Sequence, residues 1–314
     1  MNRIAFIFPG QGSQYTGMGK DFFETSGKIR DLYAEAETVL KINLSEKIFN
    51  GNAEALKDTA VSQPAIFLTS FSCCRMLEEA DIFPEVMAGH SLGEYSALTC
   101  SETFSFSDGL KIVQKRSLWM AEASREHPGK MAAVIGLSAE EVRKICQSVK
   151  GRGVISTANL NSPRQTVISG ESLAVEEAMK LARERGAGRV VVLRVSGAFH
   201  TELMKEAGDK LKGFLDSIDL KPPRVPVVSN VTANSEKEPL RIKENLIKQV
   251  SHPVRWTDSV ENLINQGFNV FIEVGPRRVL SGLLAQFGNK EIISLNVEDR
   301  ESLEKTKEAV SKVT

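Results

Sequence analysis

The chain has 314 residues, 41% of them hydrophobic, which is enough for a sizeable core in one large domain or two ordinary ones. Its 40 lysines and arginines balance 40 aspartates and glutamates, so no overall charge attracts nucleic acid or an anionic membrane. The apolar run that ends at Phe8 is too short for a signal peptide and no apolar stretch reaches membrane-spanning length, so we expect a soluble cytoplasmic protein with no nucleic-acid or membrane partner.

The first predicted element is a buried strand at residues 4–8, apolar throughout, which a glycine-rich turn at 9–14 ends. This turn lacks the Lys-Ser/Thr ending of a P-loop and the G-x-G-x-x-G spacing of a dinucleotide site, so neither nucleotide site is predicted. Its exposed backbone N–H groups are still suited to form half of an anion hole.

Hydrophobic periodicity predicts the elements of a parallel sheet covered by helices. The expected helices are 26–40, 64–80, 107–124, 202–217 and 240–250, and the expected strands after the first are 86–89, 225–229 and 269–273. Pro64 is expected in the first turn of its helix, with Gln63 as a plain helix-entry residue. Segments on both sides of residues 127–196 are expected to build this one sheet.

Residues 127–196 show a different pattern, which predicts a small unit inserted into the sheet domain at 1–126 and 197–314. Its expected elements are a strand at 131–136, a helix at 138–149, strands at 154–159 and 165–169 joined by a turn at 160–163, a helix at 171–185 and a strand at 190–195. This β-α-β-β-α-β order fits a ferredoxin-like subdomain. The predicted fold class is therefore α/β, a parallel-sheet core with an inserted ferredoxin-like subdomain.

Cysteine usage argues against metal and redox chemistry. Cys73, Cys74, Cys100 and Cys146 have neither C-x-x-C spacing nor a clustered histidine. We expect four buried thiols in a reducing compartment and no metal site.

The segment from Val86 to Tyr95 contains the pattern Gly89-x-Ser91-x-Gly93, typical of a serine on a sharp strand-to-helix turn. The two glycines allow strand and helix to pass closely, and a helix that begins at Leu92 directs free N–H groups towards charge that develops beside the serine. The pattern alone arises by chance roughly 0.1 to 0.2 times in a chain of this length. The other motifs in the chain must therefore decide whether Ser91 lies on such a turn.

A nucleophilic serine needs a base, and four histidines compete for that role. His90 adjoins Ser91 on an extended segment, so its side chain should leave from the opposite face. His127 and His252 each precede a proline in a predicted loop. His200 lies where a strand gives way to a helix, at the sheet edge where catalytic groups collect, so we predict His200 as the base.

No carboxylate completes a triad. In hydrolase order it would lie between Ser91 and His200, and Asp108 does, but at a helix start, where capping explains it better. We therefore expect a backbone carbonyl to orient His200.

Arg116 shares a helix face with Ile112 and Met120, at positions i, i+4 and i+8. Two interpretations carry equal weight from this pattern. The arginine stem passes the edge of the core and its charge reaches solvent, or a guanidinium held in a pocket grips a carboxylate through two parallel hydrogen bonds.

These motifs occur together, and in this order, in a known family. They are Pro9–Ser13, Gln63–Ala65, Gly89–Tyr95, Arg116, Ala158–Pro163, Phe199–His200, Asn245–Trp256 and Glu273–Pro276. The chain resembles the malonyl-CoA:acyl carrier protein transacylases from Arg3 to about residue 284. The resemblance implies a hydrolase-like α/β core that carries a ferredoxin-like subdomain, with the site in the cleft between them.

The resemblance also implies a role for each matching residue. Ser91 would be the acylated nucleophile, His200 its general base and acid, Gln11 and Leu92 the backbone N–H donors of the oxyanion hole, Arg116 the ligand of the malonyl carboxylate, and Gln249 the carbonyl that orients the histidine. Phe199 accompanies malonyl selection in related acyltransferases. Ser117 and Arg277 stand where the family commonly has glycine.

The function expected from this resemblance is a ping-pong transfer of a malonyl group from malonyl-CoA to acyl carrier protein, in fatty acid biosynthesis. Coenzyme A and phosphopantetheine would enter as parts of the substrates, with no bound cofactor, and the enzyme would be a monomer. The alternatives are a serine esterase or thioesterase of the α/β-hydrolase type, and a non-catalytic binding protein with this fold. A missing HGGG-type loop, the missing carboxylate and the inserted unit argue against the esterase.

Overall fold

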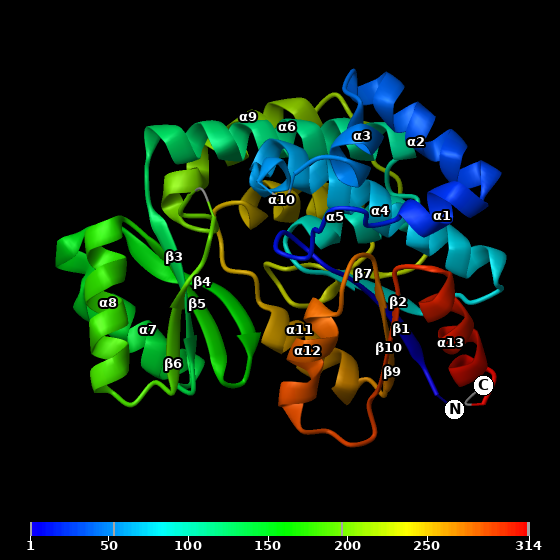
Figure 1. Ribbon diagram of the computed structural model, residues 1–314. Coiled ribbons are helices and arrows are strands. Elements are labelled where there is room, and N and C mark those ends of the chain that lie inside the picture. Colours follow the sequence, from blue (N-terminus) through cyan, green and yellow to red (C-terminus); the bar gives the residue numbers. More distant parts are fainter. Residues whose placement is uncertain (1, 53, 196, 313–314) are drawn as a thin grey trace.

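Two β-sheets organise the chain in this computed structural model, which describes residues 2–52, 54–195 and 197–312 (Figure 1). The core sheet contains, in spatial order, β10 (Ile293–Val297), β9 (Val270–Val274), β1 (Ile4–Phe8), β2 (Val86–Gly89), β7 (Val227–Val228) and β8 (Ser235–Glu236). The strand pairs from β10 to β7 are parallel, and β8 is antiparallel to β7. Strands from both sides of the second sheet in sequence therefore share this core sheet.

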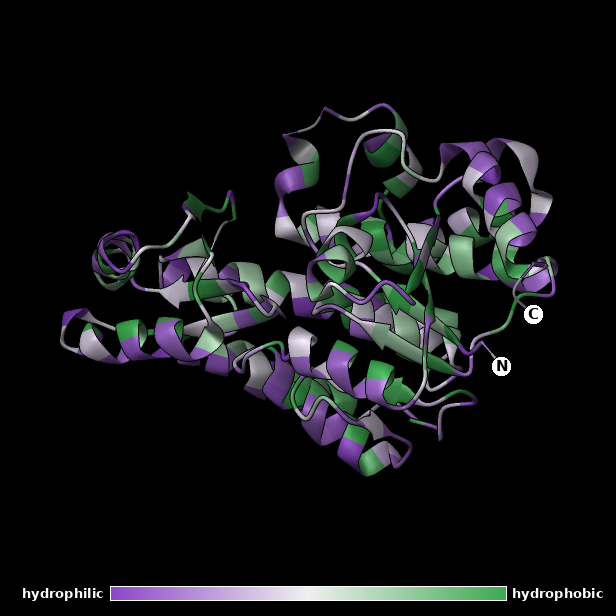
Figure 2. Ribbon diagram, turned by 90° about the horizontal axis from the view of Figure 1, so that it is seen from below, coloured by the Kyte–Doolittle hydropathy of each residue, from purple (hydrophilic) through white to green (hydrophobic). Residues whose placement is uncertain are grey.

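Both faces of the central strands β1, β2 and β9 are buried, which explains why β1 and β2 carry no polar side chain. Along β1, Phe6 and Phe8 join the hydrophobic cluster with α4 (Thr59–Glu79), α5 (Leu92–Cys100) and α6 (Phe106–Glu126). Ala5 and Ile7 pack on the other face, with α11 (Trp256–Asn265) and α12 (Val279–Leu284). Figure 2 shows the hydrophobic residues gathered on the strands and on the helix faces turned towards them.

The second sheet has the spatial order β4 (Ile155–Ser162), β5 (Gln165–Gly170), β3 (Lys130–Ile135) and β6 (Arg189–Val192). Along the chain, its main elements follow the order strand, helix, strand, strand, helix, strand. Its neighbouring strands are antiparallel. Ala132 and Val134 face α7 (Ala139–Ser148) and α8 (Ser172–Glu184), which cover one side. Met131 and Ala133 turn the opposite way and join the main hydrophobic cluster. The second sheet thus presents its uncovered face to the rest of the molecule.

A short backbone bridge fixes β4 against the core. Leu160 N donates to Val254 O at 2.9 Å, and Val254 N donates to Ala158 O at 2.8 Å. Val254 comes five residues after the end of α10 (Pro239–Gln249). The bridge therefore brings the second sheet beside the end of that helix.

The remaining helices lie around these layers (Figure 1). They are α1 (Lys20–Thr25), α2 (Gly27–Leu40), α3 (Leu44–Phe49), α9 (Lys205–Leu215) and α13 (Arg300–Val310). In the described ranges, no helix combines the length and the hydropathy that crossing a membrane requires.

Several local predictions were wrong. The strand expected at 190–195 ends at Val192, and the helix expected at 202–217 begins as a 3-10 turn, with α9 starting at Lys205.

The helix expected from Pro64 begins five residues earlier, at Thr59, because the Asp58 side chain accepts a hydrogen bond from Ala60 N at 2.9 Å and caps it there. Pro64 therefore lies inside α4.

The four-residue turn expected at 160–163 was also wrong. Strand β4 continues to Ser162, because irregularities at Thr157/Asn159 and Leu160/Ser162 shift its register against β5. Ser196, the last residue of the predicted inserted unit, lies outside the described residues.

Candidate active site

The turn between β2 and α5 positions Ser91. The backbone of Ser91 has a φ of 53°, a region that side-chain-bearing residues adopt at a cost and that is common at functional sites. A Cβ on Gly89 would lie 1.9 Å from the carbonyl carbon of Gly93, and a Cβ on Gly93 would lie 2.0 Å from Phe8 O. Only glycine fits at either position, so the spacing Gly-x-Ser-x-Gly has a steric cause here.

We expect Gly93→Ala to destabilise the fold by about 3 kcal/mol, because the methyl group overlaps backbone that cannot move away alone. Gly282→Ala is the matched control, since a Cβ on this helical glycine meets nothing within 4 Å. Thermal unfolding should show a lower midpoint for Gly93→Ala and an unchanged or slightly higher one for Gly282→Ala. Equal midpoints would contradict the steric account.

Asn230, just after β7, holds the Ser91 turn from the neighbouring strand. Its Oδ1 accepts from Ser91 N at 2.7 Å, and its Nδ2 donates to Gly89 O at 2.6 Å. The Ser91 N–H therefore already donates a hydrogen bond and is not free to bind an oxyanion. Leu92 N and Gln11 N, by contrast, have no hydrogen-bond partner among the described residues, and both residues line the cavity beside Ser91.

His200 lies beside Ser91. Its Nε2 is 2.9 Å from Ser91 Oγ, and its Nδ1 is 2.8 Å from Gln249 O. Because a carbonyl can only accept, Nδ1 carries the proton and Nε2 is free to accept from the serine. Burial, together with the positive charge of Arg116, lowers the pKa of His200 to about 3, so the ring is neutral at neutral pH.

A backbone carbonyl, rather than a carboxylate, therefore orients this histidine. Asp108 lies in the first turn of α6, where its N–H donates to Ser105 Oγ at 3.0 Å and its carboxylate accepts from the same hydroxyl at 2.7 Å. The prediction that Asp108 belongs to a helix start is confirmed.

The other histidines point elsewhere. His90 Nε2 is 2.8 Å from Asn161 Oδ1, and its ring packs against Trp256 with 5.8 Å between the ring centroids. His252 Nδ1 is 2.9 Å from Lys248 O, and His127 is exposed.

Arg116 is 1% exposed, so its charge does not reach solvent past the core edge. Its Nη1 donates to Gln63 Oε1 at 2.6 Å, and its Nη2 donates to Ser91 Oγ and to Gln249 Oε1, both at 3.0 Å. Its Nε is buried without a partner among the described residues. Burying a cation whose direct hydrogen-bond partners are all neutral costs free energy, and such a cation is therefore a strong binding site for an anionic group.

Gln63 is the contact that sequence reasoning missed. It lies inside α4 and not at the helix entry, its side chain is buried, and it accepts from the guanidinium across the α4–α6 interface. The motif Gln63–Ala65 was a signal, but the pairing of α4 with α6 is not visible in the sequence.

These residues enclose one small cavity of about 80 Å³. Its polar lining is Gln11, Gln63, His90, Ser91, Arg116, Asn159 and His200, and its apolar lining is Leu92, Met120, Met131, Leu193, Val195 and Phe199. The predicted site residues Ser91, His200, Arg116, Gln11 and Leu92 thus meet, with Gln249 directly behind them. Within the described residues, no group of three or more His, Cys, Asp or Glu is placed to hold a metal ion.

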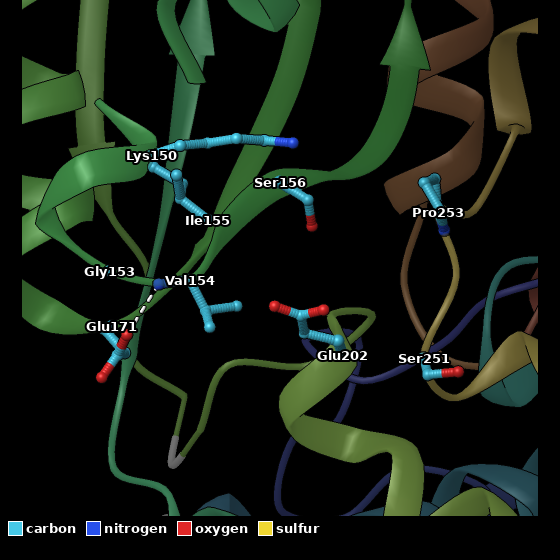
Figure 3. A pocket seen from close by; sticks show the side chains of 9 residues that line it. All are labelled: Lys150, Gly153, Val154, Ile155, Ser156, Glu171, Glu202, Ser251 and Pro253. Carbon is cyan, nitrogen blue, oxygen red and sulfur yellow. Dashed lines mark hydrogen bonds between the residues drawn. The ribbon is translucent and has the colours of Figure 1, made fainter. Parts of the chain in front are cut away.

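A larger cavity, of about 530 Å³, lies between the start of β4 and the segment that follows α10 (Figure 3). The Glu202 side chain points into it, whereas the Glu171 carboxylate turns away to accept a hydrogen bond from Val154 N at 2.6 Å. Its lining includes neither Ser91 nor His200, so we place the chemistry in the smaller cavity.

A serine hydroxyl, a neutral imidazole and a buried guanidinium meet in this cavity. Residues 5–308 match the family model described as "Acyl transferase domain". The chain therefore belongs to the acyl transferase domain family.

Comparison with named relatives places the chain more narrowly among the acyl transferases. The malonyl CoA-acyl carrier protein transacylase of Bacillus subtilis is 46% identical over 305 residues, which are 97% of this chain and 96% of the relative. The solved structure of the enzyme of that name from Coxiella burnetii has a TM-score of 0.94 at 36% identity and covers 98% of this chain and 97% of its own. A malonyl-transacylase solved in complex with a type II PKS acyl-carrier protein has a TM-score of 0.95 at 38% identity, over 98% of this chain and 100% of its own. Within its class, the chain belongs to the malonyl CoA-acyl carrier protein transacylases.

Proposed function

We propose that this protein transfers a malonyl group from malonyl-CoA to the phosphopantetheine thiol of acyl carrier protein, as a cytoplasmic, monomeric enzyme of fatty acid biosynthesis. One observation carries the proposal. The Ser91 hydroxyl lies 2.9 Å from His200 Nε2 and 3.0 Å from the buried guanidinium of Arg116, so the nucleophile, its base and a carboxylate ligand share one cavity. The assignment of malonyl-CoA and acyl carrier protein as substrates is supported by the names of the relatives and by the relative solved with an acyl-carrier protein.

The first half-reaction acylates the serine. Ser91 Oγ attacks the thioester carbonyl of malonyl-CoA while His200 Nε2 takes the hydroxyl proton. Leu92 N–H and Gln11 N–H donate to the oxyanion of the tetrahedral intermediate. The carbon–sulfur bond then breaks, and His200 returns the proton to the sulfur, so that coenzyme A leaves as a thiol and malonyl-Ser91 remains.

In the second half-reaction the carrier thiol is the nucleophile and Ser91 Oγ is the leaving group. The phosphopantetheine thiol attacks the ester carbonyl of malonyl-Ser91 and gives its proton to His200. The carbon–oxygen bond breaks, and Ser91 Oγ recovers the proton. Both halves use the same base and the same two N–H donors, and coenzyme A and phosphopantetheine enter only as parts of the substrates, with no bound cofactor.

Arg116 selects the acyl group in this mechanism. A malonyl carboxylate offers the guanidinium an anionic acceptor, whereas an acetyl or long acyl group leaves the buried charge without one. Phe199, Met120 and Met131 limit the space beside the acyl group, since all three line the small cavity.

We also infer the domain organisation behind this site. Residues 1–126 and 197–314 would form a hydrolase-like core and residues 127–196 a ferredoxin-like subdomain. The support is the element order of the second sheet, together with a spatial order that puts β5 and β3 in the middle.

The proposed activity is tested by mixing the protein with malonyl-CoA and acyl carrier protein and weighing the carrier by mass spectrometry. The holo carrier, which has the phosphopantetheine thiol, should gain a malonyl group. The apo carrier, which lacks the thiol, is the control and should stay unmodified. Free malonate with an unmodified holo carrier would instead identify a serine hydrolase.

A further inference from the structure

Glu94 is a buried carboxylate that the mechanism above does not use. It lies in the first turn of α5, three residues after Ser91, and is 3% exposed. Its Oε2 accepts from Gln249 Nε2 at 2.7 Å and from Asn230 N at 3.1 Å. Both donors belong to residues that hold the active site together.

The Gln249 side chain links Glu94 to Arg116. Its Oε1 accepts from Arg116 Nη2 at 3.0 Å, while its Nε2 donates to Glu94 and, at 2.8 Å, to Ser91 O. A carboxylate can only accept, so the amide nitrogen faces Glu94 and the amide oxygen faces the guanidinium. One amide group therefore separates a buried positive charge from a buried negative one.

Few other charges surround this carboxylate. Among the described residues, Arg116 on α6 and Tyr95 on the same helix as Glu94 are the titratable groups that interact with it electrostatically, while Ser229, Asn230 and Gln249 are neutral. His90 and His200 make no hydrogen bond to it in the described part of the chain. Burial raises the pKa of Glu94 to about 7, partly offset by its hydrogen bonds and by Arg116.

We infer that Glu94 is a positioning residue, which serves as the counter-charge of Arg116 in the empty site and takes up a proton from solvent when a malonyl carboxylate binds that guanidinium. The inference rests on the proposed function. Two buried carboxylates, one in contact with the guanidinium and one an amide group away from it, disfavour each other's ionised forms, so the second anion drives protonation of the first. The protonated Glu94 still accepts from Gln249 through its unprotonated oxygen, so Arg116 keeps its place.

The direction of the pH dependence follows from linkage. The malonyl-bound form holds the extra proton, so malonyl binding weakens as the pH rises through the pKa of Glu94 in the empty site, about 7. Well below that pH, Glu94 is already protonated and binding takes up nothing. Acetyl-CoA brings no carboxylate to Arg116 and should show neither effect.

The test counts protons on binding. Titration calorimetry of Ser91→Ala, which cannot be acylated at this residue, is run in two buffers of different ionisation enthalpy with malonyl-CoA and with acetyl-CoA. The difference between the two ligands removes the contribution of coenzyme A. We expect malonyl-CoA to take up most of one proton at about pH 8 and a small fraction of one at about pH 6.

Glu94→Gln in the Ser91→Ala background is the matched variant, since an amide mimics the protonated carboxyl in shape and cannot titrate. It should bind malonyl-CoA without the extra proton at either pH. Malonyl binding by Ser91→Ala without proton uptake overturns the inference alone, and so does equal uptake after Glu94→Gln. No binding of malonyl-CoA at any pH overturns the proposed function and the inference with it.

Discussion

Replacement of His200 by alanine is expected to slow acylation by malonyl-CoA about a hundredfold to ten-thousandfold, the usual contribution of a positioned general base. The hydrogen bond from Ser91 Oγ to His200 Nε2, at 2.9 Å, is the path that the hydroxyl proton would take. The ring is buried, and the described residues place no other histidine within hydrogen-bonding distance of Ser91 Oγ. Quenched-flow mass spectrometry of malonyl-enzyme formation gives the rate.

His127→Ala is the matched control, because His127 is exposed at the end of α6 and its loss should leave the rate unchanged. The pH profile adds a second check. Because His200 has a pKa of about 3, its protonation should not slow acetyl loading anywhere between about pH 5 and 8. A rate for His200→Ala within a few-fold of the original would contradict the assigned base.

Replacement of Arg116 by alanine is expected to lower kcat/KM for malonyl-CoA by about a hundredfold to ten-thousandfold, since two hydrogen bonds to a charged group contribute roughly 1.5 to 3 kcal/mol each. Acetyl loading should fall much less, because acetyl has no carboxylate for the guanidinium. Single-turnover loading with both thioesters gives the two ratios.

Lys115→Ala is the control for Arg116→Ala, because Lys115 is the neighbouring exposed cation on α6 and lies over Trp119 outside the cavity. Arg116→Lys keeps the charge but loses the planar fork, so it should recover only part of the malonyl rate. Equal loss of malonyl and acetyl loading in Arg116→Ala would show that the arginine supports the fold or the serine and does not choose the substrate.

The short-range features of the site could be predicted from the sequence. The Gly-x-Ser-x-Gly spacing predicted the turn at Ser91, although the atom that Gly93 must avoid is Phe8 O on β1. His200 was predicted as the base from its place between a strand and a helix, although β6 ends eight residues before it. For Arg116 the helix period could not decide between a guanidinium that reaches solvent and one held in a pocket. Periodicity shows which residues share a helix face but not which elements pack against that face. The burial of its side chain decides between them.

The partners of these residues could not be predicted, because they come from distant segments. Gln63, Glu94 and Asn230 reach Arg116, Gln249 and the Ser91 turn across separations that no local pattern encodes. Seven α-helices and β-strands were not predicted either, namely α1, α3, α11, α12, α13, β8 and β10.

Ser117 and Arg277, which stand where the family commonly has glycine, lie in different structural surroundings. Ser117 is buried, and its hydroxyl donates to Gln114 O at 2.8 Å, so its polar group is satisfied within α6. Arg277 has a φ of 66°, a conformation that favours the glycine common at this position, and its guanidinium lies over the Tyr15 ring. Neither residue lines the small cavity.

The most direct test of the proposed transfer is the mass of the protein after mixing with malonyl-CoA alone. The mechanism predicts a malonyl adduct, located on Ser91 by peptide mapping, that persists in water and is discharged by holo acyl carrier protein. A protein that releases free malonate without an adduct, or that carries the malonyl group on another residue, would contradict it.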